Sequence, residues 1–112
     1  VHNMKLCDYI FDEVREGLKK VEVRLFDDKR QKIKEGDIIK FWKLPEMEEN
    51  IDVIVNKITL YDTWEDVVNN SSPKTFGPRW KSKEKLLEAL PSIWSVENIK
   101  KFGFVVFDIE LK

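Results

Sequence analysis

Alternating hydrophobic and polar positions predict a pair of β-strands in the first half of the chain. From residue 21 to 25, valine and leucine alternate with Glu22 and Arg24, which is the period-two pattern of a strand with one buried face. The alternation returns over residues 37–41, behind a Gly-Asp pair that is typical of turns. We therefore expect two strands joined by a polar loop over about residues 26–36. The first strand should face the core with its valines and present its charges on the other face.

Two further strands are expected in the second half of the chain. Residues 51–61 are rich in β-branched side chains and predict the longest strand, which bends to serve both sides of a closed sheet. Residues 103–111 predict a final strand by their alternation, and Pro45 should end the second strand because proline has no N–H for the ladder. The residues expected to contribute to the core are Leu25, Ile39, Phe41, Ile54, Ile58, Val106 and Ile109.

Helical spacing of apolar residues predicts three helices. Residues 8–16 fit a helix that ends at Gly17 in a left-handed cap. An Asp-Thr pair is suited to cap a short helix over about residues 64–68. Ser82 should begin a third helix, which Pro91 interrupts. The buried side of this helix is expected to carry Leu86, Leu87 and Leu90.

The predicted elements follow one another in the order α-β-β-β-α-α-β. No internal repeat or linker divides them, so we expect one domain over residues 1–112. Strands and helices in this order favour an α+β fold in which capping helices cover a small mixed β-barrel.

Composition excludes several classes of protein. Lysine and arginine total 20 against 21 aspartates and glutamates, a balance that argues against a protein built simply to coat nucleic acid, although a local basic groove remains compatible with it. With one cysteine, one histidine and four scattered glycines, we expect no disulfide, no metal site, no phosphate-binding glycine loop and no cofactor. Neither a membrane-spanning run nor a signal peptide is recognised, so the cytoplasm is the expected location.

Charged residues are unusually dense around the first predicted strand. Lys19, Glu22, Arg24, Lys29 and Arg30 lie within about a dozen residues. Charges on a strand face are often only solvated, but a cluster of mixed sign is also suited to binding a polar ligand. A carboxylate here would repel phosphate unless a cation pairs with it, whereas a paired carboxylate can accept hydrogen bonds from the exocyclic amine of a base.

A second group of candidate residues lies in the loop that precedes the third helix. Trp80 stands between Arg79 and Lys81, and a tryptophan flanked by cations is suited to stacking on a base while the cations contact phosphate. The alternative is that Trp80 only closes the mouth of the barrel. Single-stranded or structured RNA suits the first interpretation, because its bases are free to stack.

Several of these residues also resemble the signature of the ASCH domain, a family of small β-barrels related to PUA domains. The pattern that resembles the signature is Gly17-x-Lys19-x-x-Glu22-x-Arg24, then Lys29-Arg30, then Gly36-Asp37-x-Ile39-x-Phe41. It extends to His2-x-Met4-x-Leu6, Phe11-Asp12-x-Val14-x-x-Gly17, Ile93-Trp94-Ser95 and Phe102-Gly103-Phe104-Val105-Val106, and it is weak between about residues 44 and 90. The resemblance implies a PUA-like barrel.

The resemblance also implies a candidate enzymatic activity. Some bacterial ASCH proteins hydrolyse the amide of acetylated cytidine with a lysine just after the glycine, a threonine three residues further on, and a later glutamate. Lys19 occupies the position of that lysine, but Glu22 stands where the threonine is expected, and the nearest later glutamate is Glu84. The match therefore covers one of the three residues, with Lys19 as the candidate catalytic residue.

We therefore predict that the chain binds RNA or a nucleotide-like small molecule in a basic cleft. The cleft would be lined by Lys19, Glu22, Arg24, Lys29 and Arg30, and the loop over residues 76–81 would cover it with Arg79, Trp80 and Lys81. Two alternatives stay open, an amidohydrolase acting on an acetylated cytidine-type nucleoside and a protein-interaction module without a ligand of its own. The oligomeric state is left undetermined by the sequence.

Overall fold

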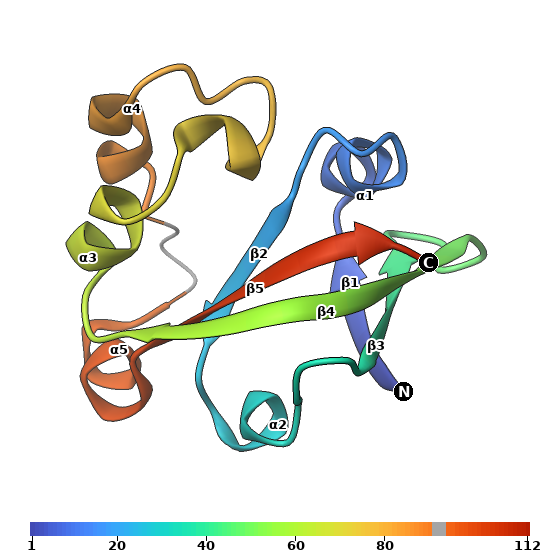
Figure 1. Cartoon of the computed structure of the whole chain (residues 1–112), viewed down its shortest axis with the longest axis horizontal. Helices are drawn as coiled ribbons and strands as arrows, with labels where there is room; N and C mark the ends of the chain where they lie inside the picture. The colour runs from blue at the N-terminus through green and yellow to red at the C-terminus, as the bar shows by residue number, and fades with distance from the viewer. Residues whose placement is uncertain (91–93) are drawn as a thin grey trace.

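A computed structural model describes residues 1–90 and 94–112 and shows a five-stranded sheet curled into a half-barrel (Figure 1). The strands lie in the order β1-β3-β4-β5-β2. β1 pairs with β3 in parallel, and the other neighbours are antiparallel, so the predicted α+β class with a small mixed, PUA-like barrel is confirmed. Their bounds are β1 His2–Leu6, β2 Val21–Leu25, β3 Ile38–Lys43, β4 Asn50–Tyr61 and β5 Phe104–Leu111.

Short helices cap the sheet, as the sequence predicts. They are α1 Asp8–Arg15, α2 Asp28–Gln31, α3 Trp64–Asn69, the 3-10 helix η1 Pro73–Phe76, α4 Lys83–Glu88 and α5 Val96–Phe102. α1, α3 and α4 were expected, whereas β1, α2, η1 and α5 were not. Pro91 and Ile93, which the sequence argument used, lie outside the described residues. Within the described residues, no helix combines the length and the hydrophobicity needed to cross a membrane.

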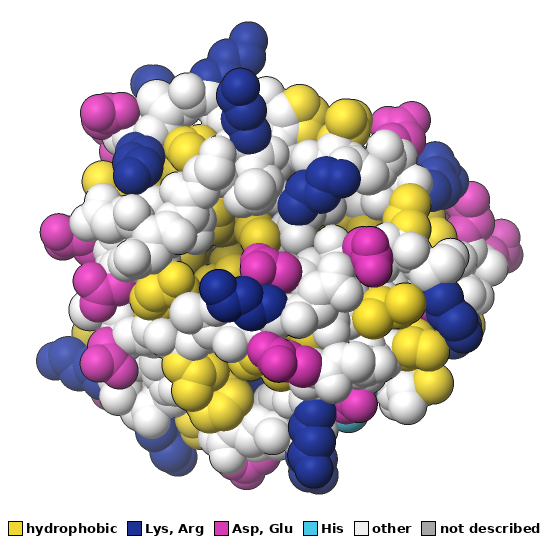
Figure 2. All heavy atoms as spheres, in the orientation of Figure 1, with side chains coloured by type: hydrophobic (Ala, Val, Ile, Leu, Met, Phe, Trp, Pro, Cys, Tyr) yellow, Lys and Arg dark blue, Asp and Glu magenta, His cyan; other side chains and the backbone are white. Residues whose placement is uncertain are grey.

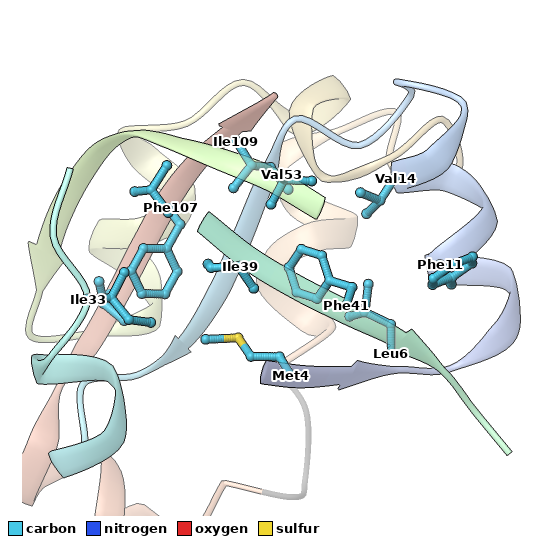
Figure 3. Packing of buried hydrophobic residues seen from close by; sticks show 12 residues of the cluster. Met4, Leu6, Phe11, Val14, Ile33, Ile39, Phe41, Val53, Phe107 and Ile109 are labelled. Carbon is cyan, nitrogen blue, oxygen red and sulfur yellow. The ribbon is translucent and has the colours of Figure 1, made fainter. Parts of the chain in front are cut away.

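The inner core fills the concave side of the curled sheet (Figure 3). Side chains from β1, β3, β4 and β5 meet there with Phe11 and Val14 of α1 and with Ile33, which follows α2. Phe41 and Phe107 are fully buried at its centre. Burial of these large apolar side chains is the main force that holds the sheet in its curled form.

A second core lies on the outer face of β2 and β5. Val21, Val23 and Leu25 pack there with Phe104 and Val106 against α3, η1 and α4. Because side chains alternate along a strand, Glu22 and Arg24 point to the opposite face, beside Phe107 and Val105 of the paired strand. Glu22 is buried there, so the alternative in which these charges are only solvated is wrong for Glu22.

One of the expected core assignments, Ile54, is corrected by the structure. In β4, Val53 and Val55 face the inner core, and Ile54 is only half-buried on the other side. A bulge between Val55 and Lys57 then shifts the alternation by one residue, which brings Ile58 against the inner core. A long apolar run does not reveal which of its faces is inward.

The third predicted helix also differs from expectation. α4 ends at Glu88, so Leu90 lies beyond it, and Leu87 is rotated away from the buried Leu86 by one helical step. Both leucines are exposed. A helix of only six residues buries one of the three leucines.

Candidate functional site

A cavity of about 290 Å³ lies where β1 and the start of α1 approach β2. β1 and β2 are the two edge strands of the sheet, so this cavity occupies the seam that the curled sheet leaves open. Its lining joins three predicted charged residues to a set of aromatic side chains. These lining residues include Lys19, Glu22, Arg24, Trp64, Trp80 and Trp94.

The aromatic side of this first cavity is built by packing among the rings themselves. The centroid of Trp64 lies 6.3 Å from that of Trp94 and 6.4 Å from that of Phe76. Trp64 is also fixed by a hydrogen bond from its Nε1 to the Leu86 carbonyl, 3.0 Å away. Trp80 packs at the edge of the second core, with the Arg79 guanidinium 5.4 Å from its ring centroid. The sequence had singled out only Trp80, although four tryptophans in 112 residues were a signal for more.

The polar side of the cavity is a chain of three charged groups. Glu22 Oε2 accepts hydrogen bonds from Arg24 Nε at 3.0 Å and from Arg24 Nη2 at 2.8 Å. Glu22 Oε1 lies 3.8 Å from Lys19 Nζ. The side chains of Lys19 and Glu22 are each only 8% exposed. The two neighbouring basic groups offset part of the cost of burying this carboxylate.

Lys19 reaches this position because of the turn that follows α1. Gly17 adopts a positive φ of 75°, and the N–H groups of Leu18 and Lys19 then both donate to the Glu13 carbonyl. The ammonium group donates to the Phe76 carbonyl at 3.4 Å and lies 5.5 Å from the centroid of the Phe76 ring.

The surroundings of Lys19 shift its protonation equilibrium toward the neutral form. Burial lowers the pKa of Lys19 below its usual value, and the charge of Glu22 opposes this shift without cancelling it. The positive charges of Arg79 and Arg24 lower the pKa further. A buried amine of this kind can act as a hydrogen-bond donor or, when neutral, as a base.

Arg24 also spans the seam between the edge strands. Its Nη2 donates to the main-chain carbonyl of Lys5 in β1, 3.0 Å away, while the same group holds Glu22. Arg24 and Lys5 line a second cavity of about 260 Å³ as well as the first. The Arg24–Lys5 bridge therefore separates two neighbouring cavities, where the sequence predicted one cleft.

Lys29 and Arg30 belong to the second cavity. They project from α2, whose start is capped by Asp27, and Arg30 also pairs with the Asp27 carboxylate at 2.9 Å. The remaining lining residues of the second cavity are Asn3, Met4, Lys5, Arg24, Trp42 and Met47.

The loop over residues 76–81 has mixed roles. Arg79 lies beside the first cavity, but its guanidinium also pairs with the Glu13 carboxylate and stacks over Tyr9, with 5.0 Å to the ring centroid. It thereby ties the loop to α1. Lys81 is exposed and lines neither of the two cavities.

Other candidate chemistry is limited in the part of the chain that the structure describes. Glu84 is exposed on α4, so the carboxylate of the first cavity is Glu22. Among residues 1–90 and 94–112, no group of three or more histidine, cysteine or acidic side chains is placed to hold a metal ion. Basic and acidic side chains are interspersed across the face shown in Figure 2, in keeping with the near balance of charges.

Comparison with known proteins identifies relatives of this fold. The family model for the ASCH domain matches residues 4–111. The crystal structure of hypothetical protein PH0355 is 30% identical, with a TM-score of 0.83, over 98% of this chain and 97% of that one. The solution NMR structure of protein PF0455 from Pyrococcus furiosus is 28% identical, with a TM-score of 0.74, over 98% and 96%. No curated protein matches. The chain therefore belongs to the ASCH domain family.

Proposed function

We propose that this ASCH domain binds RNA or a nucleotide-like ligand and holds one base in the first cavity. The observation that carries the proposal is the buried Lys19–Glu22–Arg24 group at one side of a cavity walled by tryptophans. A nucleobase has the matching character, because its faces are apolar and its edge carries donors and acceptors. The cavity is at the small end of the usual range for ligand sites, which suits a single nucleoside-sized group.

The charges on the polar side favour bases that carry an amino group. Both hydrogen bonds from Arg24 fall on Glu22 Oε2, so Oε1 is the better placed acceptor for an exocyclic amine. Lys19 Nζ, 3.8 Å from Oε1, supplies a donor for the adjacent ring nitrogen or carbonyl. Cytosine has an exocyclic amine that can donate to Glu22, beside a ring nitrogen that can accept from Lys19. Uracil would instead place a carbonyl oxygen opposite the Glu22 carboxylate.

Titration calorimetry with cytidine, uridine and oligonucleotides of each base tests the proposal. We expect the wild type to favour cytosine and the Glu22→Gln variant to lose that preference, because an amide presents a donor as well as an acceptor. Glu84→Gln, which removes an exposed carboxylate elsewhere, is the matched control. If the wild type binds none of these probes, the base site is rejected and the protein-interaction module becomes the leading function.

The lowered pKa of Lys19 supports a second candidate function, hydrolysis of an acetylated cytidine-type nucleoside. Neutral Lys19 would accept a proton from water as the water oxygen adds to the amide carbon. The C–N bond then breaks, the proton goes to the leaving amine, and the products are acetate and cytidine. Against this candidate, Glu22 stands where a threonine is expected from the family pattern.

The Lys19→Arg variant separates the two functions. Arginine keeps the charge but stays protonated at any working pH, so it cannot act as a base. We expect binding of cytidine to be largely retained and the wild type to show no turnover of acetylated cytidine. Clear hydrolysis by the wild type that disappears in Lys19→Arg would establish the hydrolase instead.

A further inference from the structure

The second cavity has a markedly one-sided charge. Among the described residues that line it, four are basic and none is acidic. They come from three separate elements, Lys5 from β1, Arg24 from β2, and Lys29 and Arg30 from α2. On a protein with nearly equal numbers of acidic and basic residues, such a local excess of positive charge indicates an anion-binding site.

The positive charge of the second cavity is only partly neutralised by the protein. Arg24 pairs with Glu22, and Arg30 pairs with Asp27. Within the described part of the chain, Lys5 and Lys29 take part in no ion pair, and Arg30 Nε is a buried donor without a hydrogen-bond partner. Buried donors are seldom left unsatisfied in a protein, so this group is suited to an acceptor that arrives with a ligand.

Repulsion among the basic groups is visible at Lys29. Its pKa is lowered first by partial desolvation and then by the charges of Arg30 and Arg24, with a smaller contribution from Lys5, while Asp27 acts in the opposite direction. A bound anion would reduce this repulsion among the positive charges.

We infer that the second cavity binds a phosphate group of the ligand whose base occupies the first cavity. This inference rests on the proposed function. The two cavities share Arg24 and Lys5, so one nucleotide can lie across the bridge with its base on one side and its phosphate on the other. Guanidinium and ammonium groups are the usual partners of phosphate oxygens, and Arg24 is placed to contact both parts of the ligand.

The phosphate can come from a mononucleotide or from an RNA strand. Trp42 also lines the second cavity, and its ring is held by a hydrogen bond from Nε1 to Asn3 Oδ1 at 3.0 Å. A fixed ring beside a phosphate site offers a surface on which the next base of a strand can stack. A strand of several nucleotides should therefore bind more tightly than one nucleotide.

The experiment compares cytidine, cytidine 5′- and 3′-monophosphate and a four-nucleotide oligocytidylate by calorimetry. It uses the wild type and the Lys5→Gln/Lys29→Gln variant, which removes two charges that have no ion pair to disrupt. Lys20→Gln/Lys57→Gln, two exposed lysines outside the second cavity, is the matched control. We expect a monophosphate to bind the wild type about tenfold more tightly than cytidine, which corresponds to about 1.4 kcal/mol.

The expected result is that the Lys5→Gln/Lys29→Gln variant loses this phosphate gain, measured as the ratio of monophosphate to cytidine affinity in the same protein. Its dependence of log affinity on log salt should also become shallower by about one to two units for the oligonucleotide. A further gain for the oligonucleotide identifies an RNA strand as the ligand, and equal affinity identifies a mononucleotide.

Two outcomes would overturn the inference, and both differ from failure of the base site. If the monophosphates bind no better than cytidine, or if the variant keeps their full advantage, the second cavity is not the phosphate site. In that case cytidine binding that depends on Glu22 still supports the proposed function. Conversely, phosphate-dependent binding that Glu22→Gln leaves unselective for base rejects the base site alone.

Discussion

The guanidinium of Arg24 donates a hydrogen bond to the main-chain carbonyl of Lys5, and this contact joins the two edge strands of the sheet. The same guanidinium holds the buried carboxylate of Glu22. One side chain thus closes the seam between β1 and β2, neutralises a buried charge and separates two cavities. Stability and ligand binding are therefore coupled at this residue.

Replacing Arg24 with methionine should destabilise the fold strongly. Among the described residues, the substitution leaves Lys19, at 3.8 Å, as the remaining ion-pair partner of the buried Glu22, and poorly compensated buried charges cost about 3–5 kcal/mol. We expect a loss of about 3 kcal/mol in the free energy of unfolding, measured in urea. The Glu22→Gln/Arg24→Met double variant should recover part of this loss, since it removes the stranded charge as well. Equal stability of Arg24→Met and the wild type would contradict this role.

Lys19 should make the stability of the protein depend on pH in the alkaline range. Its pKa in the folded state lies below the usual 10.5, so between these two values the unfolded chain binds more protons than the folded one. Stability relative to a Lys19→Met variant should therefore rise with pH through this window and level off above about pH 10.5. Unfolding in urea at several pH values measures the difference. Lys20→Met, at the exposed neighbouring lysine, is the control variant, and a flat difference for Lys19→Met would reject the shift.

Two neighbouring residues of β4 test which face of the strand is inward. Val55 is fully buried, whereas Ile54 lies half-buried on the other face. Val55→Ala should cost about 2 kcal/mol, and Ile54→Ala about 1 kcal/mol or less, although isoleucine loses more carbon atoms. Thermal or urea unfolding of both variants gives the comparison. A larger loss for Ile54→Ala would mean that the strand is turned the other way.

Two glycines with similar positive φ angles should respond very differently to alanine. Gly103 has φ of 67°, and a Cβ there would lie 2.9 Å from the Tyr61 carbonyl oxygen. Gly17 has φ of 75° with nothing within 4 Å of the added atom. Gly17→Ala should cost about 1–2 kcal/mol for the left-handed conformation alone, and Gly103→Ala clearly more. Similar melting temperatures for the two variants would show that the contact with Tyr61 is unimportant.

Much of the fold could be predicted from the sequence because periodicity reports on local structure. The alternation in β2, β3 and β5 and the spacing in α1 led to the right elements. β1 and α2 escaped prediction because they have only five and four residues, and α2 has no buried side chain, so both depend on their neighbours in space. The register of strand pairing also depends on neighbours in space. The face of β4 that points inward is set by the pairing of this strand and by its bulge.

The candidate site was predictable only where its residues are close in sequence. Lys19, Glu22 and Arg24 fall on one strand and its approach, so their proximity followed from the strand alone. The division of the predicted cleft into two cavities could not be predicted in this way, because it depends on β1 lying opposite β2 across the seam. Trp64, the first residue of α3, and Trp94, which precedes α5, join the first cavity from far along the chain, which no local pattern reveals.

The position of β5 in the sheet affects how the protein folds during its synthesis on the ribosome. β5 is the last of the five strands in sequence, yet it lies between β4 and β2. Strand β2 therefore leaves the exit tunnel long before its neighbour exists, with its valines and one hydrogen-bonding edge uncovered. Long-range pairing of this kind is slow, so the barrel and the Lys19–Glu22–Arg24 group are completed only once residues 104–111 have been synthesised.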